Sequence, residues 1–387
     1  ESIAIKRPVG RVNNRDVAER LVRTARSFGC AVERLPFACK TWTNGPSSLR
    51  VDGRQIDIGA SPFSRAVKGE GALVFIEDIG QLRVADIKGE LVMLHGAIAK
   101  EPIMPKDFPY YYPAEHQEMI SLLENGQPLA VVAVTGKHPM CGLEPFALFE
   151  DGNFLIPAAY TDKRALKAMD GRRQAEITID STVAEAFGEQ PLFFLAGEEE
   201  TRAIIICAHM DTAYNTPGAL DNASGVCVML RLMELLKDRK RRRPVVFIPF
   251  NGEDYYAVSG QQAYFYKYPP SKEDIALVLN IDDMGHVGSK NALSTYCMDA
   301  RMEEVIDELI ARDAYTVKGR PWYESDHTMF AQQGIRCLAL ASSDLTEETV
   351  KLTHTPADTP DKVDFALVEQ AAQFAVKLFE RLGYIGG

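Results

Sequence analysis

Four short apolar runs in the second half of the chain restrict the folds that it can adopt. The runs are AIIICA (203–208), VVFIPF (245–250), ALVLNI (276–281) and CLALAS (337–342). Near-continuous apolar strands of this kind are typical of a sheet that is covered on both faces. Amphipathic patterns predict helices at 222–238, 300–312, 325–333 and 363–382. This alternation predicts an α/β fold with a mixed, mostly parallel central sheet flanked by helices.

The first half of the chain follows a different pattern. Residues 13–30 predict an amphipathic helix, and AVERLPF predicts a short strand directly after it. From about residue 42, short strand-like segments alternate with Gly, Pro and Asp turns, and long helical patterns are scarce until about residue 160. We therefore expect a small β-rich domain at 42–184, inserted into a larger domain formed by 1–41 and 185–387.

The net charge and the cysteine content restrict the partners that the chain is expected to bind and the cellular compartment in which it is expected to work. The formal net charge is −11, so we expect no nucleic-acid partner. No apolar run approaches the ~20 residues that cross a bilayer, so we expect no membrane partner. The seven cysteines are odd in number and include no CxxC pair, which favours a reducing compartment over a disulfide framework. A cytoplasmic location is favoured, and a secreted or periplasmic location after removal of a leader is the alternative.

Metal-binding residue types follow three of the four apolar runs. His209 comes directly after the first run, Glu253 and Asp254 follow the second, and Asp282 follows the third. Ligands of open α/β sheets bind at the carboxyl ends of the strands. We therefore expect these side chains to meet at one edge of the sheet.

Two further residues extend this set to one that could hold two metal ions. Asp221 lies in PGALDNASG and His354 lies in THTPAD. A pair of ions needs one imidazole each, a bridging carboxylate, one more carboxylate each and a spare base. Each motif alone has an ordinary explanation, such as helix capping by Asp221. Their order along one sheet edge favours a metal site.

Neighbouring acids suggest roles beyond ligation. Asp211 is two residues after His209 and can accept its second imidazole N–H, which would fix the ring. Asp358, four residues after His354, could orient that ring in the same way. A metal beside Asp254 would offset the charge of the adjacent carboxylates and leave Glu253 as a general base.

The ordered motifs resemble those of a known family. AHMD, PGALDNASGV, NGED, LNIDDMG, SDHTMFAQQGI and HTPADTPDKVD are similar to the successive motifs of the di-zinc aminopeptidases. That family includes aminopeptidase Y, the bacterial leucyl aminopeptidases and the glutamate carboxypeptidase II branch. The resemblance covers residues 190–387 with the N-terminal helix and strand, and it implies a zinc exopeptidase-like fold. The inserted domain resembles the protease-associated type, most clearly in LRVADIKGELVMLHG.

The resemblance also implies the chemistry. It implies that His209, Asp221 and Asp282 bind one zinc, and that Asp221, Asp254 and His354 bind the other. It implies an aminopeptidase that removes N-terminal residues from peptides through a hydroxide that bridges the metals, with Glu253 as general base. Asp211, which orients His209, is the second expected catalytic residue. Co²⁺ or Mn²⁺ could occupy the same ligands. A homo-oligomer is a further expectation.

The sequence departs from the family pattern at three places near the site. YYAVSGQ (255–261) replaces the usual GLxGS. Asp254 stands where the family usually has Glu, so one ligand arm is shorter. Thr353 stands where several members have a Tyr that helps to bind the oxyanion. The residues that we expect to contact the substrate or support the ligands are Asp358, His327, Asp326, Tyr323 and His286.

Two other functions remain open from the sequence. A carboxypeptidase or amidohydrolase could use the same metal site, since Arg320 and Arg336 flank the SDH motif and could bind a substrate carboxylate. A non-catalytic binding protein of this fold would lack some of the ligands, and none is missing here.

Overall fold

The chain forms two compact units. The computed structural model describes residues 2–169, 173–199 and 202–386. The first unit joins Glu1–Cys39 to Phe187–Gly387, and the second is Lys40–Ala186. The strands β1 (Ala31–Val51) and β8 (Gln174–Leu195) connect them and pair with each other. Phe37 of β1 lies so close to Gly188 of β8 that a Cβ on that glycine would be 2.4 Å from the ring.

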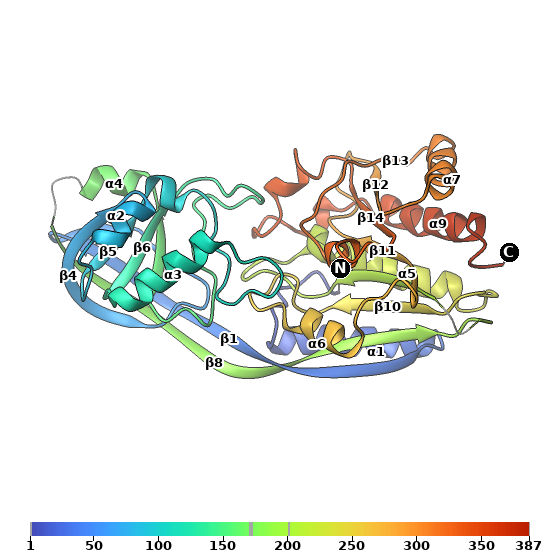
Figure 1. The fold of residues 1–387 in the computed structure, drawn as a ribbon, viewed down its shortest axis with the longest axis horizontal. Helices are drawn as coiled ribbons and strands as arrows, with labels where there is room; N and C mark the ends of the chain where they lie inside the picture. Colours follow the sequence, from blue (N-terminus) through green and yellow to red (C-terminus); the bar gives the residue numbers. More distant parts are fainter. Residues whose placement is uncertain (1, 170–172, 200–201, 387) are drawn as a thin grey trace. The chain divides into compact units, whose positions relative to one another are not determined.

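The sheet of the first unit has four parallel strands at its centre (Figure 1). These are β9 (Ala203–His209), β10 (Val245–Phe250), β11 (Ile275–Ile281) and β14 (Cys337–Ser342), in the order β14-β11-β9-β10. At the outer sides, β12 (Asn291–Tyr296) is antiparallel to β14 and parallel to β13 (Thr316–Lys318), and β8 is antiparallel to β10. The four predicted strands and the mixed, mostly parallel sheet are confirmed.

Two cores cover the two faces of this sheet. Alternate residues of a strand point to opposite faces, so Ile204 and Ile206 enter one core while Ile205 and Cys207 enter the other. The first core is covered by α1 (Val12–Ser27), α5 (Gly225–Leu236), α7 (Ala300–Ala311) and α9 (Phe365–Arg381). The second is covered by α6 (Ser259–Lys267) and α8 (His327–Ala331). The predicted helices are present, and α6 was not predicted.

The strand β1 is much longer than the short strand predicted from AVERLPF. It runs for 21 residues, because most of it pairs with other strands instead of packing into a core on its own. Its burial pattern mixes exposed and buried positions without a long apolar run. Cross-strand pairing of this kind leaves little local signal in the sequence.

The second unit contains a parallel sheet and helices, and is thus less purely β than predicted. Its sheet follows the order β4 (Val67–Ile76), β5 (Leu91–Leu94), β6 (Ala130–Thr135) and β7 (Ala158–Asp162), all parallel. The short β3 (Gly59–Ala60) pairs antiparallel with β7, and β2 (Arg54–Ile56) pairs with β1. The helices are α2 (Ile79–Val84), α3 (Ala114–Gly126) and α4 (Arg164–Met169). The 13-residue α3 shows that helical structure begins well before residue 160.

The helix α3 buries few residues, which explains why its pattern was missed. Met119, Ile120 and Leu123 are its buried side chains, and they pack on β5 and β6. The other positions are exposed or half-buried. None of the described helices is long and apolar enough to cross a membrane.

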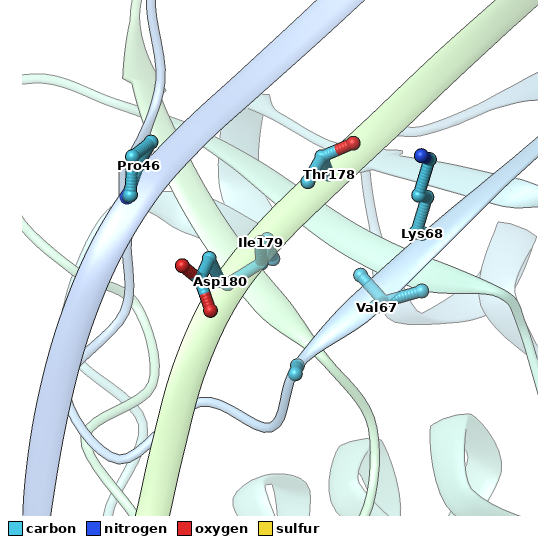
Figure 2. A pocket seen from close by; sticks show the side chains of 7 residues that line it. Pro46, Val67, Lys68, Thr178, Ile179 and Asp180 are labelled. Atoms are coloured by element: carbon cyan, nitrogen blue, oxygen red, sulfur yellow. The ribbon is translucent and has the colours of Figure 1, made fainter.

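A hollow of about 560 Å³ opens in the second unit beside β4 and β8 (Figure 2). Its charged side chains are Lys68 and Asp180, and both are exposed. Solvated charges of this kind are ordinary surface features.

Candidate metal centre

The predicted site residues converge at the carboxyl ends of the parallel strands. His209 is the last residue of β9 and is paired in register with Phe250, the last residue of β10. Glu253 and Asp254 are the third and fourth residues after β10, and Asp282 directly follows β11. The parallel register therefore brings these side chains to one edge of the sheet, as expected.

Asp221 lies between the two histidines. Its Oδ1 is 2.9 Å from Nε2 of His209, and its Oδ2 is 3.2 Å from Nε2 of His354. The remaining carboxylates are divided between the same rings: Asp282 Oδ1 is 3.3 Å from His209 Nε2, and Asp254 Oδ1 is 2.9 Å from His354 Nε2. The five predicted ligands therefore form two half-sites that share Asp221.

These separations suit donor atoms around a small cation. Ligands about 2.0–2.1 Å from a tetrahedral zinc lie about 3.3 Å from one another. The donor atoms of His209, Asp221 and Asp254 all lie within 4.8 Å of one another, as do those of Asp221, Asp282 and Asp283. Imidazole and carboxylate are the ligand types that zinc accepts in proteins.

The electrostatics of the cluster also favour positive charge. Burial alone would lower the pKa of His209, but the carboxylates of Asp282, Asp211 and Asp221 raise it well above its ordinary value. Burial would raise the pKa of Asp221, but the two histidines lower it. Buried carboxylates are costly unless a cation compensates them. The residues present therefore fit a pair of metal ions.

Asp282 is better placed as a ligand than its neighbour Asp283. Ser325 donates its hydroxyl to Oδ2 of Asp282 at 2.6 Å, which leaves Oδ1 facing His209. Burial, and then the charge of Asp221, raise the pKa of Asp283 well above its usual range. A carboxyl group must lose its proton to bind a metal.

The shorter side chain at position 254 still reaches the site. Oδ1 of Asp254 faces His354, and Oδ2 accepts a hydrogen bond of 2.7 Å from the backbone N–H of Ala213. Its side chain is only 2% exposed. Although aspartate is shorter than the glutamate usual in the family, the loop after β10 brings the carboxylate of Asp254 next to His354.

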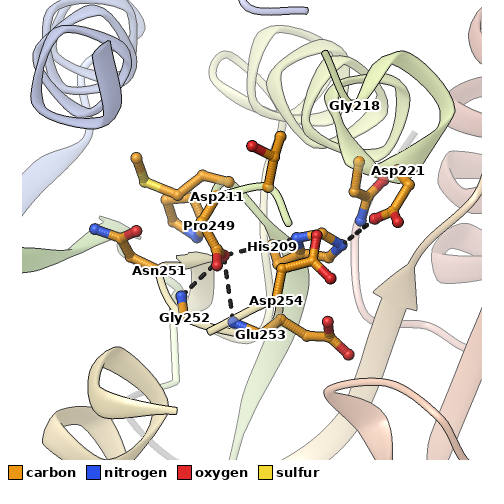
Figure 3. A network of polar contacts seen from close by, with 12 residues as sticks. His209, Asp211, Gly218, Asp221, Pro249, Asn251, Gly252, Glu253 and Asp254 are labelled. Carbon is orange, nitrogen blue, oxygen red and sulfur yellow. Dashed lines mark hydrogen bonds and ion pairs between the residues drawn. The ribbon is translucent and has the colours of Figure 1, made fainter. Parts of the chain in front are cut away.

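Glu253 lies on the loop after β10 that also carries Asp254, near His209 (Figure 3). Its backbone N–H donates to Oδ1 of Asp211 at 3.2 Å, and the N–H of Gly252 donates to the same oxygen at 2.8 Å. Burial, opposed by the charge of His209, raises the pKa of Glu253 well above its ordinary value. A general base must both accept and return a proton, and burial is one means by which enzymes tune a carboxylate for that task.

Asp211 supports the loop that carries Glu253 more directly than it supports His209. Nδ1 of His209 lies 3.7 Å from Oδ1 of Asp211, beyond hydrogen-bond distance, whereas both loop N–H groups reach that oxygen. In the described part of the chain, Nδ1 of His209 has no hydrogen-bond partner. The predicted contact between these residues is thus longer than expected.

Asp358 holds the backbone of Asp221 and of the residue before it. Its Oδ1 accepts from the N–H of Leu220 at 2.7 Å, and its Oδ2 accepts from the N–H of Asp221 at 3.1 Å. Burial, with the nearby charge of Asp221, raises the pKa of Asp358 to about 7. The sequence predicted that Asp358 orients His354, whereas both oxygens bind the turn that carries Asp221.

His327 is part of a buried polar network. Asn280 Nδ2 donates to Ser325 Oγ at 2.8 Å and lies 3.3 Å from Nδ1 of His327. Nε2 of His327 is 2.9 Å from the carbonyl of Trp322. The ring is fully buried, and burial lowers its pKa, so a neutral ring accepts from Asn280 and donates to Trp322.

The other three predicted contact residues lie in different settings. Asp326 is buried, accepts from Nε2 of Gln261, and has its pKa raised by burial to about 7. Tyr323 is 59% exposed and packs edge-on against Tyr296, at 5.5 Å between ring centroids. His286 binds Asp344, with 2.7 Å between Nδ1 and Oδ2. The hydrogen bonds described for Tyr323 and His286 go to residues outside the ligand set.

Sequence reasoning missed three supporting residues. Asn280 and Ser325 lie within the motifs LNIDDMG and SDHTMFAQQGI, so their polar side chains beside the acidic residues were a usable signal. Arg7 gave no such signal, because its hydrogen-bond partners Met210 and Pro217 lie about 200 residues away in the chain.

Comparison with known proteins finds a matching family. Residues 194–379 match the model described as Peptidase family M28. The predicted family resemblance is confirmed. The predicted class of enzyme, a peptidase, is confirmed with it. The matched segment contains all five proposed ligands and Glu253.

Relatives of known structure share the fold along most of the chain. Aminopeptidase YwaD of Bacillus subtilis is 23% identical over 345 residues, which cover 84% of this chain and 70% of that protein. An aminopeptidase from Aneurinibacillus sp. strain AM-1 has a TM-score of 0.78 at 18% identity, covering 98% of this chain and 91% of its own. The zinc aminopeptidase BSAP from Bacillus subtilis has a TM-score of 0.71 at 20% identity, covering 97% and 90%. These likenesses confirm the predicted fold class.

Proposed function

We propose that this chain is a zinc-dependent aminopeptidase that binds two metal ions. The observation that carries the proposal is Asp221, whose two carboxylate oxygens face His209 and His354 at 2.9 and 3.2 Å. One carboxylate shared by two imidazoles is the arrangement that a pair of ions requires. The family match supports peptide-bond hydrolysis as the reaction.

Each half-site would hold one ion. His209 and Asp282 would bind the first, His354 and Asp254 the second, and Asp221 both. When bound, zinc would lower the pKa of a water molecule and polarise the carbonyl of the scissile bond. Cobalt or manganese could be held by the same donors.

Glu253 would move the proton. In the proposed step its carboxylate accepts a proton from the attacking water as the oxygen–carbon bond forms. It then gives that proton to the leaving nitrogen as the carbon–nitrogen bond breaks. The products are a free amino acid and a peptide shortened by one residue. Asp211 holds the loop that carries Glu253, because its Oδ1 accepts the backbone N–H groups of Gly252 and Glu253. This fixed loop supports the role of Glu253.

An aminopeptidase is favoured over a carboxypeptidase. Arg336, one of the two cations considered for a substrate carboxylate, donates to Oδ2 of Asp299 at 3.0 Å. The backbone carbonyl of Arg320 accepts from Ser294, and its side chain is exposed. The relatives named above are aminopeptidases.

We also propose that the 40–186 unit is a protease-associated-type insertion. Its place between the two parts of the first unit supports this. The segment LRVADIKGELVMLHG, which carries the resemblance, forms the end of α2, the turn after it and β5.

Two measurements test the proposal. Elemental analysis after zinc reconstitution should find two zinc equivalents per chain, and a chain that retains none would contradict it. Amino-acid anilides should be hydrolysed, whereas dipeptides with a blocked amino group and a free carboxylate should not. The reverse substrate preference would favour the carboxypeptidase alternative.

A further inference from the structure

A fully buried arginine lies behind the metal centre. Arg7 is 0% exposed, and within residues 2–169, 173–199 and 202–386 it is the one lysine or arginine that is buried. A guanidinium is protonated at every pH at which proteins fold, and it carries five N–H donors in a rigid plane. Such a group is costly to bury unless its donors and its charge are both matched.

The donors of Arg7 are matched by backbone carbonyls from two segments of the site. Nε donates to Met210 O at 2.7 Å, Nη1 donates to Pro217 O at 2.8 Å, and Nη2 donates to Gly218 O at 3.1 Å. Nη1 also reaches Ile5 O at 3.2 Å. One planar group therefore fixes the spacing between the end of β9 and the turn at 217–218.

Both segments carry residues of the metal centre. Met210 stands between His209 and Asp211, and the turn at 217–218 leads directly to Asp221. Gly218 is tightly enclosed, with a φ of +63°, and a Cβ there would be 2.3 Å from the carbonyl oxygen of Asp221. A change in the position of Arg7 would therefore move the bridging carboxylate relative to His209.

The charge of Arg7 is matched by carboxylates. Those of Asp211, Asp221, Asp254 and Asp358 each interact favourably with the guanidinium. Two of them are proposed ligands, and the other two hold the backbone around the site. The arginine therefore lies where the negative charge of the centre is concentrated.

The segment that carries Arg7 is itself tied to the strand ends. The backbone N–H of Arg7 donates to Oγ1 of Thr212 at 3.1 Å, and its carbonyl accepts from Nδ2 of Asn14 at 3.0 Å. Asn14 also exchanges hydrogen bonds of 2.8 and 3.0 Å with Asn251, next to the loop of Glu253. The guanidinium is thus held in place from both sides.

We propose that Arg7 is a positioning residue of the metal centre, which sets the place of Asp221 relative to His209 through the carbonyls of Met210, Pro217 and Gly218. The proposal rests on the proposed function, since it concerns the same metal ions. It makes the N-terminal segment, which lies outside the family match at 194–379, a working part of the site. A lysine could supply the charge but could not span three carbonyls in one plane.

The test compares zinc affinity in three variants. Arg7→Met removes the charge and the donors, and Arg7→Lys keeps the charge alone. Leu21→Ala is the control: it lies on α1 in the same N-terminal segment, is 1% exposed, and makes none of the contacts above. Each protein is titrated with a zinc chelator of known affinity, at a temperature where all are folded by circular dichroism.

We expect both Arg7 variants to bind zinc about 10- to 100-fold more weakly than the wild type, and Leu21→Ala to match the wild type. The proposal is wrong if Arg7→Met stays within twofold of the wild type, if Arg7→Lys restores wild-type affinity, or if the control loses as much. A wild-type chain that binds no zinc would instead contradict the proposed function. If the Arg7 variants fold only with excess zinc, the proposal requires that they need at least 10-fold more zinc to fold than Leu21→Ala does, because zinc stabilises any destabilised variant by mass action. If neither folds even then, Arg7 is a determinant of the fold alone and the proposal fails.

Discussion

The hydroxyl of Ser325 donates a hydrogen bond of 2.6 Å to Oδ2 of Asp282. The opposite oxygen of that carboxylate faces His209 at 3.3 Å. Oδ2 is therefore held by the hydroxyl, whereas Oδ1, which also accepts the backbone N–H of Asp283 at 3.0 Å, is the oxygen that faces His209. The hydroxyl itself is fixed by Asn280, at 2.8 Å.

This relationship predicts the effect of Ser325→Ala. The variant frees Oδ2 of Asp282, so the carboxylate can rotate away from the first half-site. We expect zinc affinity there to fall by about 10- to 100-fold, measured by chelator competition. Ser181→Ala, which also removes a buried hydroxyl but in the second unit, should bind zinc like the wild type. Equal affinity in Ser325→Ala and the wild type would show that Asp282 is held without the hydroxyl.

Glu253→Gln separates proton transfer from metal binding. The amide keeps the size of the side chain but cannot accept a proton from water, so kcat should fall by about 10²- to 10⁴-fold. Zinc content should stay at the wild-type value, since Glu253 is not among the five proposed ligands. A variant that turns over at close to the wild-type rate would exclude Glu253 as the base.

His354→Ala should weaken the second half-site. The ring is the imidazole nearest to Asp254, at 2.9 Å, so its removal should reduce bound zinc from two equivalents towards one. His286→Ala is a matched control, because that imidazole binds Asp344 and should leave both equivalents in place. Retention of two equivalents by His354→Ala, measured after dialysis by elemental analysis, would remove His354 from the ligand set.

Asp326 should make the metal-free protein less stable as the pH rises. Burial raises the pKa of Asp326 from 3.8 to about 7. Between these values the folded chain keeps a proton that the unfolded chain releases, so stability is highest near pH 4, falls towards pH 7 and changes no further above it. The total loss is at most about 4 kcal/mol.

Asp326→Asn tests that assignment, because the amide is neutral at every pH. Urea unfolding of the metal-free variant at pH 5 and pH 8 should show a smaller difference than the same pair of measurements on the wild type. An unchanged difference would mean that the Asp326 carboxyl titrates with an ordinary pKa.

The sequence predicted the strand-end residues well because local rules govern them. An apolar run marks a buried strand, and a ligand one to four residues beyond it must lie at the sheet edge, as His209 and Asp254 do. Asp221 was recognised through its turn and through the family resemblance. These signals lie within a few residues of the side chain that they concern.

The missed features depend on distant parts of the chain. Arg7 is buried only because the carbonyls of Met210 and Pro217 meet it from about 200 residues away. The four-residue spacing predicted that Asp358 orients His354, whereas its Oδ1 accepts a hydrogen bond from the backbone N–H of Leu220. The length of β1 is set by its partner strand, which local periodicity does not reveal.

The pairing of β1 with β8 has a consequence for how such a chain can be rebuilt. The backbone leaves the first unit after Cys39, on β1, and returns at Phe187, on β8. These two strands are paired, and Phe37 of β1 packs against Gly188 of β8. A hairpin turn of two residues can join antiparallel strands. The 147-residue excursion between these points could thus be deleted, or exchanged for another module, without cutting any strand that carries the metal ligands.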